Sequence, residues 1–173
     1  MNRPSRDTPA ALAASHVVLR ILVVLNWMYG AIVLAILVGM FAAVHWTMTA
    51  LGFPSTAEST ALTAQGVRMI AAIGIAGVPL NLLVLKRLLA MVETVRSGDP
   101  FVAGNAARLQ VIAFAVLGQQ LLQLVVGIVS RTMTPVKISA FSKGGWLAVI
   151  LLFVLARVFA EGTRMRDELE GTV

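Results

Sequence analysis

Four long blocks of apolar residues, free of Asp, Glu, Lys and Arg, dominate the pattern along the chain, over 21–44, 69–85, 109–130 and 144–156. A helix crosses hydrocarbon with roughly 20 apolar residues, within a usable range of about 17–25. The first three blocks reach this length directly. The fourth reaches it when the Arg157 side chain extends toward the headgroups. The pattern therefore predicts membrane-spanning helices over about 19–44, 67–87, 108–130 and 141–160.

The same blocks exclude the alternative architectures. Backbone amides in lipid must bond internally, and a membrane barrel would need alternating strands that these continuous apolar runs do not provide. Composition agrees, because 58% hydrophobic and 13% charged residues do not fit a soluble domain. We predict an all-α membrane protein, a four-transmembrane-helix bundle over residues 17–173, preceded by a flexible tail over residues 1–16.

The distribution of basic residues predicts the orientation. With four spans, the two termini and the 86–108 connection share one side, which carries ten of the fourteen Lys and Arg residues: Arg3, Arg6, Arg20, Lys86, Arg87, Arg96, Arg108, Arg157, Arg164 and Arg166. The other side carries Arg68, Arg131, Lys137 and Lys143. Because positive loops stay inside, both termini are predicted to be cytoplasmic. This asymmetry also explains the net charge of +6 without direct nucleic-acid binding.

The connections differ between the two sides. On the outer side, residues 45–65 and 131–143 contain Pro, Gly, Ser and Thr and are predicted to be loops. On the cytoplasmic side, the second and fourth helices are predicted to extend beyond the membrane. The first extension continues an apolar stripe of Leu88, Leu89, Val92 and Val95. The other carries a ladder of opposite charges, Arg157, Glu161, Arg164 and Glu168.

A turn and a new helix start are predicted between the second and third spans. Gly98 supplies a left-handed helix stop, and Asp99 before Pro100 is typical of an N-cap followed by a first-turn proline.

This stretch and the chain end resemble a bacterial membrane family, domain-of-unknown-function family 2975. The first resemblance consists of Gly98, Asp99, Pro100, Phe101, Asn105, Arg108 and Leu109; the second consists of Phe159, Gly162, Met165, Glu168, Glu170, Thr172 and Val173. The chain departs from the family pattern at Ala160, where a basic residue is common, and at Met165, where Leu is usual. The resemblance covers about residues 17–173. It implies a protein of the bacterial cytoplasmic membrane, associated with small helix-turn-helix regulators, and it supplies no catalytic residue.

Polar residues inside the spans are the other candidates for function, because each costs free energy in hydrocarbon unless it finds a partner. Asn26 and Asn81 are predicted at a similar depth, where the two form a hydrogen bond if the first two helices are antiparallel neighbours. Gln119, Gln120 and Gln123 lie near the middle of the third span. One interpretation is hydrogen bonding between helices, within the chain or in a homo-oligomer. The other is a polar pathway or binding site.

No catalytic, metal or cofactor site is predicted. The chain has no Cys, and its two histidines, His16 and His45, fall on opposite sides of the predicted membrane. The catalytic motifs of nucleotide-binding, hydrolase and metalloprotease families do not occur. We therefore expect a non-enzymatic membrane protein whose cytoplasmic face binds a protein partner, such as a DNA-binding regulator. The alternative is a small-solute or ion pathway lined by Gln119 and Gln123.

Overall fold

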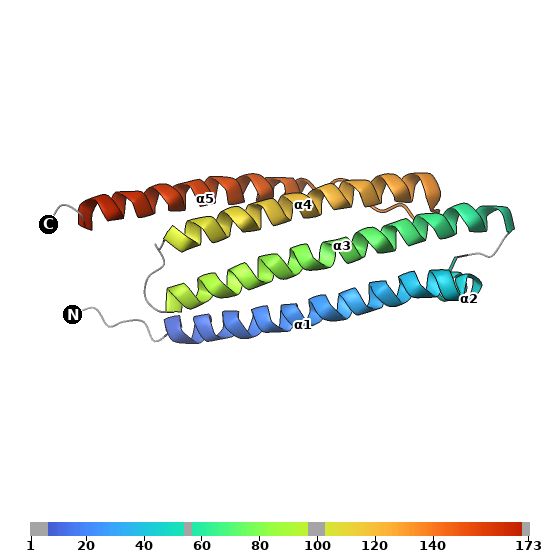
Figure 1. The fold of residues 1–173 in the computed structure, drawn as a ribbon, viewed down its shortest axis with the longest axis horizontal. Coiled ribbons are helices and arrows are strands. Elements are labelled where there is room, and N and C mark those ends of the chain that lie inside the picture. Colours follow the sequence, from blue (N-terminus) through green and yellow to red (C-terminus); the bar gives the residue numbers. More distant parts are fainter. Residues whose placement is uncertain (1–6, 54–56, 97–102, 171–173) are drawn as a thin grey trace.

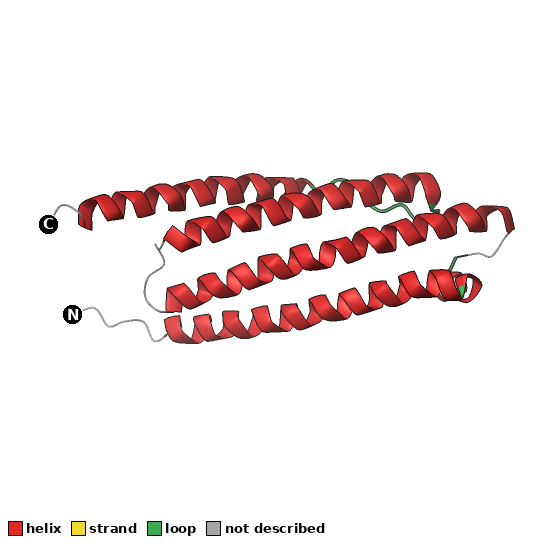
Figure 2. Ribbon diagram, viewed as in Figure 1, coloured by secondary structure: helices red, strands yellow, loops and turns green. Residues whose placement is uncertain are grey.

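The computed structural model describes residues 7–53, 57–96 and 103–170, and in these ranges the chain forms five helices and no strand (Figures 1 and 2). They are α1 (Asp7–Ala42), α2 (Val44–Ala50), α3 (Ala57–Arg96), α4 (Ala103–Met133) and α5 (Lys143–Glu170). Four candidate membrane spans lie within them, at Ser15–Ala42, Ala61–Arg96, Gly104–Met133 and Lys143–Met165. The predicted all-α fold with four spans is confirmed.

The four long helices run antiparallel and pack in chain order, with α1 on α3, α3 on α4, and α4 on α5 (Figure 1). Large apolar side chains point outward along the whole array, for example Trp27, Phe41 and Ile150, which are 61%, 71% and 59% exposed. In water such a surface would drive aggregation, whereas in a bilayer it faces lipid tails. The array is thus built for a hydrocarbon solvent.

The connection between the first two spans differs from the predicted loop over 45–65, because helix α2 and the start of α3 occupy most of it. Met48 of α2 is 1% exposed and packs with Met40, Ala64 and Val67, which closes the junction of α1 and α3. Gly52, at φ 79°, ends α2: the Phe53 amide donates to the Met48 carbonyl at 2.9 Å. Burial of Met48 outweighs the turn-forming residues that predicted a loop.

Helix α1 begins at Asp7, so ten of the sixteen residues predicted to form a flexible tail are helical. The run Ala10–Ala14 has high helix propensity. Pro9 falls in the first turn, where its missing N–H costs no intrahelical bond.

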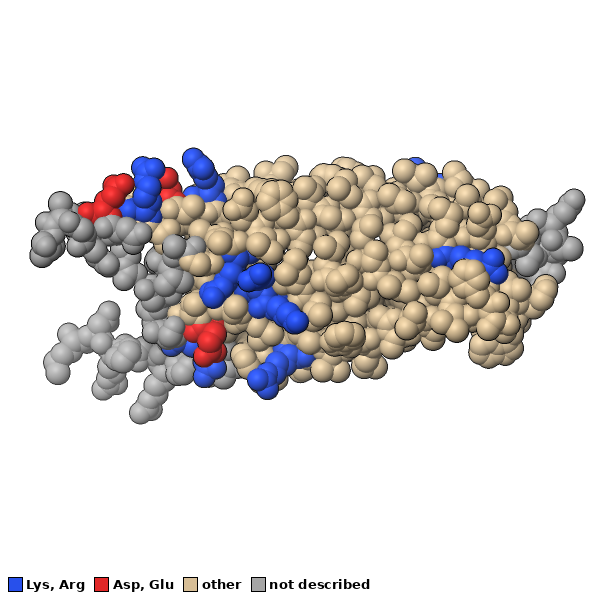
Figure 3. All heavy atoms as spheres, viewed as in Figure 1, with Lys and Arg blue, Asp and Glu red and all other residues tan. Residues whose placement is uncertain are grey.

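Both predicted helical extensions are present as continuous helix. Helix α3 continues past Lys86 to Arg96, and α5 continues to Glu170, past the level at which α4 begins (Figure 1). Lys and Arg side chains gather at this end of the molecule, together with Glu, while the visible middle is uncharged (Figure 3). We call this the basic end.

Helix α5 is displaced along α4 toward the basic end. Its Gly145 lies against the Gln120 side chain, and the Phe153 ring meets the Phe114 ring edge-on with centroids 5.1 Å apart. Residues 134–142, which are not helical, run back along the last turns of α4, where the Ile138 amide donates to Ser130 Oγ at 2.9 Å. Helix α5 therefore starts beside the middle of α4.

Candidate functional site

Two side-chain amides bond to consecutive carbonyls of α3 beside its proline. Gln119 of α4 donates from Nε2 to the Gly77 carbonyl at 2.9 Å, and Asn26 of α1 donates from Nδ2 to the Val78 carbonyl at 3.3 Å. The next residue, Pro79, lacks an N–H and crowds the helix turn before it. Each carbonyl oxygen has a second lone pair that can accept these bonds. The α1 and α4 helices are thus tied to α3 at one level.

Glycines allow this close approach. A Cβ at Gly77 would lie 3.2 Å from Gln119 Oε1, and a Cβ at Gly74 would lie 3.2 Å from Tyr29 Oη. Both distances are tighter than ordinary van der Waals contact, so small residues here let the neighbouring polar side chains reach the α3 backbone.

A cleft of about 440 Å³ opens at the same level between α3 and α4. Its polar lining comes from Tyr29, Asn81, Gln119 and Gln123, and the rest of the lining is apolar. A neighbouring cleft of about 390 Å³ is lined by Asn26 and again by Tyr29 and Asn81. These polar groups are neutral donors and acceptors, so the clefts suit a small uncharged polar molecule.

The predicted Asn26–Asn81 hydrogen bond does not form; the two residues line one cleft, and Asn26 bonds to the α3 backbone instead. Gln120 is 9% exposed and faces Gly145, away from the cleft that Gln119 and Gln123 line. Gln123 donates from Nε2 to the Ser139 carbonyl at 3.5 Å. The glutamines therefore separate into different surroundings on α4.

The non-helical segment 134–142 depends on polar groups of α4. Ser130 is fully buried, and its hydroxyl accepts from the Ile138 amide at 2.9 Å. The single hydroxyl proton has two acceptors within reach, the Gly127 carbonyl at 3.2 Å and the Ile138 carbonyl at 3.4 Å. Thr134 Oγ1 donates to the Ser130 carbonyl at 2.9 Å. Non-helical backbone at membrane depth is tolerated only when such groups satisfy it. Ser130 is a residue that the sequence analysis missed, because an isolated Ser near a span end carries no distinctive signal.

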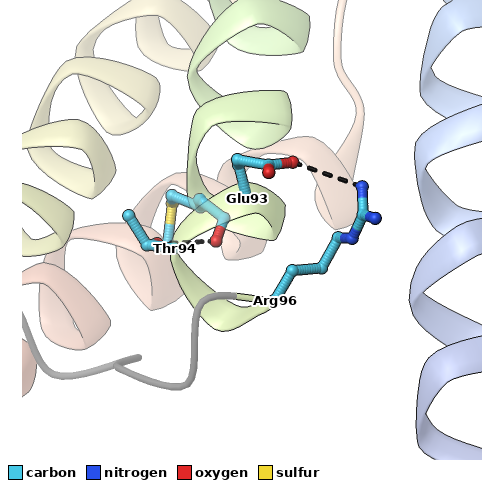
Figure 4. Close-up of polar contacts among 4 residues, drawn as sticks. Glu93, Thr94 and Arg96 are labelled. Carbon is cyan, nitrogen blue, oxygen red and sulfur yellow. Dashed lines mark hydrogen bonds and ion pairs between the residues drawn. The ribbon is translucent and has the colours of Figure 1, made fainter.

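At the basic end, a polar cluster around one buried residue joins α3 to α4. Asn105 is 1% exposed, donates to Thr94 Oγ1 at 2.9 Å, and accepts from Arg108 Nη1 at 2.7 Å. Arg108 Nη1 also lies 3.3 Å from the Ala90 carbonyl. Thr94 in turn donates to the Met91 carbonyl at 2.7 Å (Figure 4). Asn105 and Arg108, predicted as an interaction motif, thus connect helices within the molecule.

The last residues of α3 are exposed in contrast. Arg96 and Glu93 form an ion pair at 3.4 Å with side chains 48% and 65% exposed (Figure 4). The predicted motif residues Gly98, Asp99, Pro100 and Phe101 lie outside the residues that the structure describes.

The α5 extension carries part of the predicted ladder. Arg164 pairs with Glu161 at 3.2 Å and with Glu168 at 3.3 Å, whereas the predicted pair of Arg157 with Glu161 does not form. Val158 and Met165 lie on the same extension and are 59% and 58% exposed. Of the other predicted motif residues there, Phe159 is half-buried and Gly162 has open space beside it.

Within the ranges that the structure describes, no three His, Asp or Glu residues gather in a way that could hold a metal ion. The absence of a cofactor and of catalytic residues stays a prediction.

Comparison with known proteins places the chain in a family. The model of the family described as "Protein of unknown function (DUF2975)" matches residues 51–173, which is more than two thirds of the chain. The matched range begins at the end of α2 and includes α3, α4 and α5. No curated protein matches the chain, and no solved structure does.

Proposed function

The chain belongs to the family of proteins of unknown function DUF2975, and from that premise we propose that it is a non-enzymatic membrane protein whose basic end binds a protein partner. The observation that carries the proposal is the exposed surface of the α5 extension. Met165 stands exposed beside the Glu161–Arg164–Glu168 ladder, on a helix that extends past its neighbour α4. Apolar residues at helical spacing with charged flanks are typical of helices that dock into a partner's groove.

The basic end is proposed to face the cytoplasm of a bacterium, with both termini inside. The support is the excess of Lys and Arg at this end. Since the chain has no Cys, single cysteines report orientation directly. In intact cells, a membrane-impermeant maleimide should label the Lys137→Cys variant and spare the Glu168→Cys variant. Labelling of only the Glu168→Cys variant would reverse the orientation.

The class of partner, a small helix-turn-helix regulator, rests on the family resemblance. A pulldown from membranes with Met165→Asp should lose the partner that the wild-type chain retains, since a carboxylate at the centre of an apolar contact is costly to bury. His45→Asp, an exposed substitution at the opposite end, serves as the control. Retention of the same partners by both variants would refute the proposal.

A second candidate function is a pathway for a small solute, favoured by the cleft of about 440 Å³ with its neutral polar lining. Replacing Gln119 and Gln123 together by Leu should abolish flux of small uncharged solutes into liposomes. Asn81→Leu, which alters the same lining without breaking a hydrogen bond of the fold, should reduce flux as well. If wild-type liposomes admit no tested solute faster than empty ones, this candidate fails.

A further inference from the structure

A groove of about 360 Å³ runs between α4 and α5 near the basic end. Four alanines form most of its walls, Ala106 and Ala107 from α4 and Ala156 and Ala160 from α5. Phe153 also lines it, next to its contact with Phe114 in the apolar part of the array. Because alanine side chains fill little volume, the two helices leave a channel lined by methyl groups and one aromatic ring.

The polar lining of this groove consists of Gln110 and Arg157. Arg157 is exposed, and among the described residues no carboxylate pairs with it. Arg164, two helical turns further along α5, forms ion pairs with two glutamates. An unpaired guanidinium offers several N–H donors in a planar fork, which matches the oxygens of a phosphate.

The groove lies at the depth where headgroups are expected. Arg108 bonds to the Ala90 carbonyl, which places this level of α4 one turn beyond Lys86 on α3. Ala107 and Arg157 line the same groove, so Arg157 shares that level. Between Lys86 and Arg68, α3 has seventeen uncharged residues, about 26 Å of helix, which is close to the thickness of a hydrocarbon core. Arg157 therefore sits just outside the apolar layer, while Phe153 sits at its edge.

We propose that this groove binds an anionic phospholipid, with one acyl chain along the alanine walls and the phosphate on Arg157 and Gln110. Charge complementarity favours such a lipid, because the unpaired Arg157 at the end of an apolar groove matches a molecule with an acyl chain and a negatively charged headgroup. A soluble phosphate would leave the alanine walls without a ligand. A peptide partner would have to reach Phe153, which contacts Phe114 in the apolar part of the array.

Native mass spectrometry of the purified full chain tests the proposal, in micelles that contain equal amounts of phosphatidylglycerol and phosphatidylcholine. The wild-type chain should retain about five times as much phosphatidylglycerol as phosphatidylcholine, the factor expected for one basic residue near the membrane surface. Arg157→Gln should bring the ratio close to one, and Arg157→Lys should keep most of the preference. Ala107→Leu, which fills the groove, should lower the number of retained lipids with either headgroup.

Arg131→Gln, an exposed cation at the opposite end, is the matched control and should keep the wild-type ratio. An equal fall for Arg131→Gln and Arg157→Gln would overturn the proposal, because net charge alone would then explain the preference. Unchanged lipid retention by Ala107→Leu, or displacement of the lipid by an equal concentration of glycerol phosphate, would overturn it too. Circular dichroism confirms that each variant keeps its helices before it is compared.

Discussion

The guanidinium of Arg68 donates to the carbonyl of Met40 from Nε at 3.0 Å and from Nη2 at 2.6 Å. Helix α1 ends at Ala42, so this carbonyl is one of the last four, which have no intrahelical donor. The positive charge also lies at the negative end of the helix dipole, and the guanidinium sits 4.8 Å from the centre of the Phe41 ring. Arg68, which the sequence analysis used only as one of the few charges on the predicted outer side, therefore caps the C-terminal end of α1 and joins it to α3.

Arg68→Gln should lower the free energy of unfolding by about 1.5–3 kcal/mol, the range for hydrogen bonds to charged groups. Thermal unfolding of the purified chain in one detergent measures the change. Arg131→Gln, at the same end and exposed, should shift the transition by far less. Equal shifts for the two variants would show that Arg68 acts only through net charge.

Asn105→Ala should destabilise the basic end, because it leaves the half-buried Arg108 and Thr94 side chains without the buried amide that bonds to both. The expected cost is about 1–3 kcal/mol, the range for hydrogen bonds of which one is made to a charged group. Hydrogen exchange should show faster opening at the end of α3 and the start of α4 than elsewhere. Asn81→Ala, which removes an exposed amide from α3, gives the baseline; equal protection in both variants would contradict the role of Asn105.

The amides of Gln119 and Asn26 should contribute separately to the association of the helices, because they bond to different carbonyls of α3 from different sides. Gln119→Leu and Asn26→Leu should each cost about 0.6 kcal/mol and at most about 1.7 kcal/mol, the range within membranes. The double variant should show the sum to within about 0.5 kcal/mol. A large coupling energy would mean that Pro79 transmits one contact to the other.

The spans and both helical extensions could be predicted from sequence because charge-free blocks of about 20 residues and helical stripes are local signals. The α2 helix could not, since it depends on burial of Met48 against Met40 of α1 and against Ala64 and Val67 of α3, a packing that no local residue pattern predicts. The hydrogen-bond partners of the polar residues inside the spans could not be predicted either. The sequence placed Asn26 and Gln119 at helix contacts, but only packing decides that backbone carbonyls beside Pro79 accept their bonds. The role of Arg68 likewise depends on the packing of α3 against the end of α1, and that of Ser130 on the segment 134–142 running back along α4.

Two glycines provide the sharpest test of the segment that runs back along α4. A Cβ at Gly127 would collide with the backbone of Ala140, whereas a Cβ at Gly162 would meet nothing within 4 Å. Gly127→Ala should therefore cost about 1–3 kcal/mol, as overpacking does, because backbone cannot move aside as a flexible side chain can. Gly162→Ala should instead stabilise α5 by about 0.5–1 kcal/mol, since it removes chain entropy from a helix interior. Thermal unfolding of the two variants should thus shift in opposite directions. Stabilisation by Gly127→Ala as well would show that residues 134–142 do not pack on α4 in the membrane.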